Sequence, residues 1–151
     1  MLSAKDYLEM LKNYEEALAD LYDAIGAKSF FRKSVWKTLS SEGDARIEKI
    51  NELIDFVDKN KNALILRNFV GTDAVEAKNF VLNVLNLFDA GKISKRECIK
   101  RIADIESSVM EMDLYGKLSS ENIAIREIID KLRYSISRRI TTLNTEKKRW
   151  F

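Results

Sequence analysis

Apolar residues recur every three or four positions along most of this chain, the spacing that one face of an amphipathic helix requires. Five segments carry the pattern, and they predict helices over about residues 4–25, 29–59, 73–90, 94–117 and 120–147. Ser3 is expected to cap the first helix and Gly26 to end it. The segments Asp73–Glu76, Ser94–Glu97 and Ser119–Glu121 carry start signals for the third, fourth and fifth helices.

The order and length of these helices predict an elongated all-α bundle in one domain, residues 1–151. At ~1.5 Å per residue the second helix would be about 45 Å long, which is more than the width of a small domain. Short links join the first helix to the second and the fourth to the fifth, so each pair is expected to form an antiparallel hairpin. About thirty residues that contain the third helix connect the hairpins, and this crossover must run along the bundle. Within it, residues 63–70 are apolar but too short for periodicity to separate a strand from a helix.

Composition agrees with a helical fold and excludes several kinds of site. The chain has no proline and five glycines, so little interrupts a helix. A net charge of +2 is too small to indicate binding to a nucleic acid or to a membrane surface. The single cysteine, Cys98, excludes an internal disulfide and a zinc knuckle, and is interpreted as a small buried apolar residue. Because no apolar run spans a membrane and the N-terminal segment is charged, we expect a cytoplasmic protein.

Four charged residues stand in the middle of the apolar stripes, one on each long helix: Glu15, Arg46, Glu106 and Arg139. They match in number and sign, so we predict two interior ion pairs, Glu15 with Arg46 and Glu106 with Arg139. The alternative is that the carboxylates lie at stripe edges and that the arginines extend their heads into solvent. Gly43, inside the second helix, is interpreted as room for the guanidinium of Arg139.

The stripes also carry a resemblance to a known family. Glu15–Tyr22 is similar to the first helix of the rubrerythrin branch of the ferritin-like superfamily, where a ligand Glu precedes a Tyr by seven residues. Trp36–Arg46 resembles the second helix, whose Leu-x3-Glu-x-x-His run supplies two ligands. Ile105–Val109 and Leu132–Arg139 repeat these features. The resemblance covers about residues 3–145 apart from the crossover and implies a ferritin-like four-helix bundle.

Six residues stand at the metal-ligand positions that the resemblance implies: Glu15, Gly43, Arg46, Glu106, Ile136 and Arg139. Gly43 and Ile136 replace glutamates, while Arg46 and Arg139 replace histidines, and the chain contains no histidine at all. The di-iron chemistry of the family needs several oxygen ligands and imidazoles, and an arginine cannot lose its proton to become a ligand. We therefore expect no metal, no cofactor and no catalytic residue, and a structural role for these six positions.

Two further features bear on partners. From residue 131 onward seven lysines and arginines face one acidic residue, Glu146, and the tail Lys147–Phe151 ends in two aromatic residues. A solvated helix end that complements the helix dipole is one interpretation. The other is a docking site for a partner, a second subunit or an acidic membrane face. A set of apolar residues in the crossover exceeds what one buried stripe needs, which predicts a homodimer: Leu64, Leu66, Phe69, Leu82 and Leu87.

Two functions from different classes follow from this sequence. The first is a non-catalytic ferritin-like bundle with a binding or scaffolding role. The second is a rubrerythrin-like redox enzyme or metal-binding protein with an altered site. Four tyrosines are interpreted as residues of the core or its rim rather than as radical or stacking sites: Tyr7, Tyr14, Tyr22 and Tyr115.

Overall fold

Five α-helices dominate the computed structural model, which describes residues 2–67 and 72–150 apart from the side chains of Thr72 and Trp150. The helices are α1 (Ala4–Ala27), α2 (Lys33–Lys59), α3 (Thr72–Asp89), α4 (Lys95–Met112) and α5 (Ile123–Trp150). The shorter elements of the described chain are the 3-10 helix η1 (Tyr115–Lys117) and the strands β1 (Ile65–Leu66) and β2 (Leu118–Ser119). The all-α prediction is confirmed, because each predicted helix is present.

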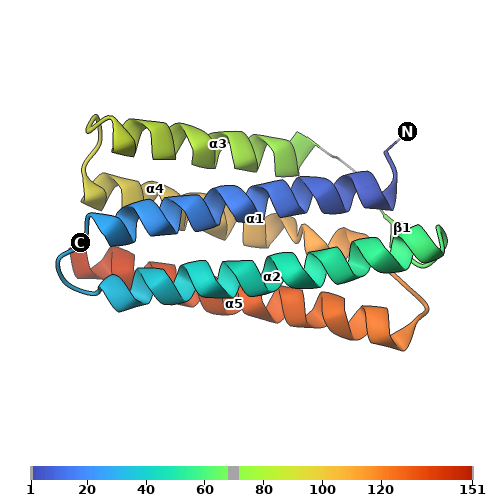
Figure 1. Cartoon of the computed structure of the whole chain (residues 1–151). Helices are drawn as coiled ribbons and strands as arrows, with labels where there is room; N and C mark the ends of the chain where they lie inside the picture. Colours follow the sequence, from blue (N-terminus) through green and yellow to red (C-terminus); the bar gives the residue numbers. More distant parts are fainter. Residues whose placement is uncertain (1, 68–71, 151) are drawn as a thin grey trace.

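Four of these helices, α1, α2, α4 and α5, form a bundle, and α3 lies along its outside against α1 and α4 (Figure 1). Neighbouring helices in the bundle run antiparallel, whereas α2 and α4 run in the same direction (Figure 1). The chain must therefore return along the bundle between them, and α3 makes most of that return. The structure thus has the predicted arrangement of two hairpins joined by a crossover that contains a helix.

Local capping interactions explain where most helices begin. Ser3 and Asp6 form a reciprocal capping box at α1, and the Ser94 hydroxyl accepts from the Glu97 backbone N–H at α4. The predicted start of α5 is wrong, because Ser119 pairs in a strand and the Asn122 side chain accepts the first helical N–H groups instead. Each of these caps supplies an acceptor to N–H groups that have no partner within the helix.

Two other predicted helix ends are also wrong. The second helix begins at Lys33 rather than residue 29, because Arg32 adopts a left-handed conformation with φ 61°. The fourth helix ends at Met112 rather than residue 117, because Asp113 is left-handed with φ 46°. Gly26 does not end α1 but lies inside it, where an added Cβ would stand 3.2 Å from Cβ of Trp36. Its small size lets the two helices of the hairpin approach closely.

The ambiguous stretch after α2 forms a strand where it is described. Ile65 pairs with Ser119 and Leu66 with Leu118 in an antiparallel ladder, and the Ser120 hydroxyl donates to the carbonyl of Ala63 over 2.5 Å. These contacts fasten the start of the crossover to the link between α4 and α5. Residues 68–71, which complete this stretch, lie outside the described residues.

The core consists of the predicted stripes of the four bundle helices, nearly all of which are buried. The sequence predicts Val75, Phe80, Val84 and Phe88 as the buried residues of α3, and this is correct only in part. Phe80 is exposed and Val75 is half-buried, while Ala77 and Val81 are buried with Val84 and Phe88. The set of apolar residues that was expected to face outward also needs correction. Leu64 is buried, and Leu66 and Leu87 are half-buried, whereas Leu82 is exposed. Phe69 lies outside the described residues.

Candidate functional site

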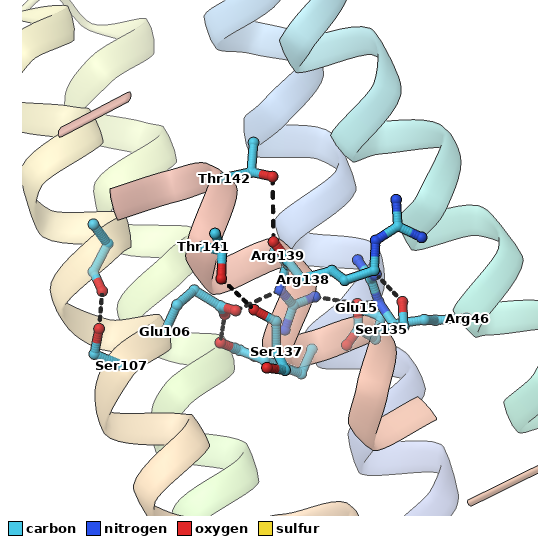
Figure 2. A network of polar contacts seen from close by, with 12 residues as sticks. Glu15, Arg46, Glu106, Ser107, Ser135, Ser137, Arg138, Arg139, Thr141 and Thr142 are labelled. Carbon is cyan, nitrogen blue, oxygen red and sulfur yellow. Dashed lines mark hydrogen bonds and ion pairs between the residues drawn. The ribbon is translucent and has the colours of Figure 1, made fainter. Parts of the chain in front are cut away.

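The four bundle helices bring their interior charges to one place at the middle of the bundle. Glu15 comes from α1, Arg46 from α2, Glu106 from α4 and Arg139 from α5, and none of these side chains is more than 1% exposed (Figure 2). Each sits where an apolar residue would continue the stripe, so helix packing carries it into the core. Interior charges at this depth are stable only when they are paired and hydrogen-bonded.

Both ion pairs that the sequence predicts are present, and Arg139 joins them into one network. Arg46 Nε donates to Glu15 Oε2 over 3.0 Å, and Arg139 Nη1 donates to the same oxygen over 2.8 Å. Arg139 Nε also lies 2.5 Å from Glu106 Oε2, although the N–H is not aligned for a hydrogen bond. Glu15 therefore holds two guanidinium groups, and Arg139 bridges the two carboxylates.

Three hydroxyl groups complete the network, and the sequence did not identify any of them as part of it. Tyr115 donates to Glu15 Oε1 over 3.1 Å, Tyr14 donates to Glu106 Oε1, and Arg46 Nη1 donates to the Ser135 hydroxyl over 2.7 Å. Tyr14 could have been identified from the sequence, because it is next to Glu15 and both side chains are buried. Tyr115 lies beyond the end of α4, and its approach to α1 depends on tertiary packing alone.

The other two candidate positions do not contribute polar atoms. Ile136 is buried at 7% exposure and packs with the core. A Cβ added at Gly43 would stand 3.6 Å from Arg46 Nη2 and 3.8 Å from Ala19 Cβ. The prediction that the guanidinium of Arg139 lies beside Gly43 is therefore wrong. Arg46 fills this space, because helical side chains point back toward the N-terminus of their own helix.

The surroundings shift the pKa values of the Glu15 and Glu106 carboxyl groups in opposite directions. Burial by itself raises the pKa of each, because an apolar interior disfavours the charged form. At Glu15 the charges of Arg139 and Arg46, together with their hydrogen bonds, outweigh burial, and the pKa lies below its usual value. At Glu106 burial prevails over the attraction of Arg139, the Glu15 charge adds to the rise, and the pKa lies above its usual value. Glu15 is thus the firmly ionised carboxylate of the network.

The network leaves some of its buried donors unused. Arg46 Nη2, Arg139 Nη2 and the Tyr22 hydroxyl have no hydrogen-bond partner among the described residues. Each buried donor without a partner costs about 1–3 kcal/mol of desolvation. These costs reduce the net contribution of the network to the free energy of unfolding.

These residues do not suit the metal pair that the resemblance implies. Glu15 and Glu106 are the only carboxylates at the six positions, and both face guanidinium groups that repel a cation. Within residues 2–67 and 72–150 no group of three or more His, Cys, Asp or Glu side chains could hold a metal ion. The centre of the bundle holds two carboxylates and two guanidinium groups, whose charges balance.

Cys98 and the basic tail can also be placed. Burial raises the pKa of the Cys98 thiol to about 12, so the group is protonated and unreactive near neutral pH. The tail continues α5 as far as Trp150, where Lys147 pairs with Asp104 over 2.8 Å and Glu146 pairs with Arg32. The Trp150 side chain and Phe151 lie outside the described residues.

The two carboxyl groups are expected to respond differently to loss of charge. Glu15→Gln should destabilise the protein by about 3–5 kcal/mol, because it removes the carboxylate that holds two buried guanidinium groups. Glu106→Gln should cost about 1 kcal/mol or less, because its amide oxygen still accepts from Tyr14 while Arg139 keeps Glu15. Urea denaturation at neutral pH measures both changes in the free energy of unfolding.

The pKa directions add a pH dependence to this comparison. Glu15 has a lowered pKa in the folded state. Its contribution to the free energy of unfolding is therefore present above the unfolded pKa of 4.5 and is lost as pH falls through the folded pKa. Glu106 has a raised folded pKa, so its contribution is present below 4.5 and is lost as pH rises through the folded value. Glu106→Gln should therefore gain stability relative to the wild type as pH rises from 4.5. Glu15→Gln should be less sensitive to acid, and identical profiles for the two variants would contradict these assignments.

Among the described residues no helix is long and apolar enough to cross a membrane. Comparison of the chain with protein-family models, with curated proteins and with solved structures gives no significant match.

Proposed function

We propose that this protein is a non-catalytic bundle of the ferritin-like type, with a binding or scaffolding role. The main support is the buried network, in which guanidinium groups engage both interior carboxylates. Arginine keeps its proton at any physiological pH, so it acts there as a fixed cation and not as an acid, a base or a ligand. The order of the helices and the crossover along the bundle agree with the ferritin-like arrangement.

The chemistry of the centre supports a structural role over a catalytic one. Glu15 accepts hydrogen bonds from two arginines and a tyrosine, which leaves it little capacity to accept a proton from a substrate. Glu106 is fully buried, and Tyr14 occupies one of its oxygens. A general acid or base must reach the group with which it exchanges a proton. Neither carboxylate is placed to do so.

Metal analysis tests this proposal against the redox alternative. The purified protein is incubated with ferrous iron, manganese and zinc in turn, passed through a desalting column and analysed for bound metal. We expect well under one equivalent of each metal and no peroxide consumption above that of free metal. Stoichiometric metal together with peroxide turnover would support the rubrerythrin-like redox enzyme instead.

We further propose that α3, which lies outside the bundle, takes part in a contact between two copies of the chain. Phe80 and Leu82 are 40% and 38% exposed on this helix, which lies outside the bundle. A second copy packed along α3 would cover both side chains. Sedimentation equilibrium at micromolar concentration is expected to show a dimer, and Phe80→Ser with Leu82→Ser to give a monomer. A wild-type monomer over the same range would contradict this.

A further inference from the structure

One end of the bundle is strongly basic. The ends of α1, α3 and α5 meet there with the starts of α2 and α4, at the side where the chain terminates (Figure 1). Residues 28–33, 89–97 and 146–149 supply nine lysines and arginines against three carboxylates, and we call these segments the basic end. The opposite end, residues 3–9, 58–67, 72–76, 111–117 and 120–127, has nine carboxylates against six cations. The charges are therefore separated along the bundle axis.

Two phenylalanines project from the basic end. Phe30 and Phe31, in the link between α1 and α2, are 91% and 77% exposed, more than any other large apolar residue described. Their rings contact each other edge to face, with centroids 5.2 Å apart. Phenylalanine has no polar atom in its side chain, so water gives these rings no compensating hydrogen bond. Such a pair marks a surface that meets an apolar phase or a partner.

The flanks of the link are fastened to the bundle, so the two rings are held outward. Lys28 Nζ donates to the carbonyl of Phe88 over 3.0 Å and lies 4.3 Å from the centroid of that ring. On the other side, Arg32 forms a bidentate pair with Glu146. The Ser29 hydroxyl donates to the carbonyl of Ile25 over 2.7 Å. The apolar tip is thus presented on a defined base.

A groove of about 590 Å³ adjoins this tip. Its apolar lining comes from Trp36, Ile99 and the two phenylalanines of the tip. The cations Lys28, Lys95 and Arg149 also line it, together with the Arg32–Glu146 ion pair. An apolar hollow with cations beside it suits a molecule that carries an anionic head and an apolar tail. The tip and the groove therefore form one continuous surface at the basic end.

We propose that the basic end docks on a membrane surface that contains anionic phospholipids, with Phe30 and Phe31 entering the boundary between headgroups and acyl chains. The cations come from three separate segments at the same end of the bundle. A flat membrane surface can therefore contact cations from all three segments at once. Anionic headgroups attract each cation, and the two phenyl rings leave water at the same time. Docking of this kind needs no membrane-crossing helix and is independent of the interior network.

Vesicle sedimentation tests the proposal with the full chain. We expect binding to phosphatidylcholine vesicles that include phosphatidylserine, little binding to phosphatidylcholine alone, and weaker binding at higher salt. The triple variant Lys33→Gln, Lys92→Gln and Lys148→Gln should weaken binding about fivefold for each charge removed. Matched controls at other parts of the bundle, Lys59→Gln, Lys61→Gln and Lys131→Gln, should leave binding nearly unchanged.

A second pair of variants separates insertion from attraction by charge. Phe30→Ser with Phe31→Ser should weaken binding about tenfold or more, whereas Ile123→Ser with Tyr134→Ser should not change it. Those control residues are 66% and 68% exposed and lie outside the basic end. No binding to the anionic vesicles, or equal loss in test and control variants, would overturn the proposal. Equally tight binding to polyglutamate would identify an acidic protein partner, and full competition by soluble glycerophosphoserine would identify a headgroup site without insertion; each overturns membrane docking.

Discussion

Arg139→Met is expected to lower the free energy of unfolding by about 3–5 kcal/mol, a large part of the ~5–15 kcal/mol that stabilises a typical domain. The reason is that Arg139 lies against both interior carboxylates, at 2.8 Å from Glu15 and 2.5 Å from Glu106. Its loss leaves Glu15 with Arg46 and removes the ion pair of Glu106. Arg46→Met should cost less, because Glu15 then keeps Arg139 and Tyr115.

A surface arginine on the same helix provides the control. Arg133 pairs with Asp113 over 2.8 Å, and both side chains are about half exposed, at 49% and 46%. Arg133→Met should therefore change the free energy of unfolding by only ~0–1 kcal/mol. Urea denaturation followed by circular dichroism compares the two variants under one set of conditions. A loss below about 1 kcal/mol for Arg139→Met would show that its charge is solvated.

Replacement of the whole Glu106 side of the network should reverse most of the loss. The triple variant Tyr14→Phe, Glu106→Leu and Arg139→Met removes the arginine together with the carboxylate and the hydroxyl that depend on it, and leaves Glu15 with Arg46. Buried ion pairs often contribute no more than a well-packed apolar group, since desolvation offsets their attraction. We expect a stability near that of the wild type. A triple variant as unstable as Arg139→Met alone would show that packing caused the loss.

The fourfold variant Gly43→Glu, Arg46→His, Ile136→Glu and Arg139→His is expected to bind about two transition-metal ions, where the wild type binds well under one. It removes both interior cations and supplies a Glu-x-x-His run on α2 and on α5, opposite Glu15 and Glu106. Carboxylates and imidazoles are the ligands that iron and manganese take in such bundles. The Glu side chain at position 43 can enter the space that Arg46 Nη2 leaves.

Two measurements distinguish a rebuilt site from adventitious binding. Metal analysis after desalting gives the stoichiometry, and thermal denaturation with and without metal shows whether binding stabilises the folded state. Adding Glu15→Ala and Glu106→Ala to the fourfold variant should abolish tight binding while leaving the new residues in place. A fourfold variant that folds but stays free of metal would refute the proposal that these positions correspond to the metal-ligand positions of a ferritin-like bundle.

Much of the fold could be predicted from the sequence because the signals involved are local. A stripe of Leu8, Leu11, Leu18 and Tyr22 has one buried face whatever it packs against, and all four residues are buried. The capping residue Ser3 acts on backbone groups three residues away. Short links also make consecutive helices pack against each other as antiparallel hairpins. The helical class and the order of the hairpins follow from these features.

The helix ends and the crossover were predicted less well, because their signals are weak or compete. Arg32 and Asp113 adopt left-handed conformations at helix ends, although neither is a glycine. Arg32 is held there by Glu146, which is more than a hundred residues away in the sequence. Ile65 and Leu66 form a strand only because the link between α4 and α5 offers a partner.

For the polar centre, the sequence by itself determined that Glu15, Arg46, Glu106 and Arg139 lie on the apolar stripes of the helices, and it favoured interior ion pairs over charged heads in solvent. Only the tertiary structure decided how they connect. Arg139 reaches both carboxylates, Tyr115 closes on Glu15 from beyond the end of α4, and Arg46 fills the space beside Gly43. The physical reason is that periodicity fixes the face of a helix, whereas contact across the bundle depends on side-chain length, rotamer and the offset between helices.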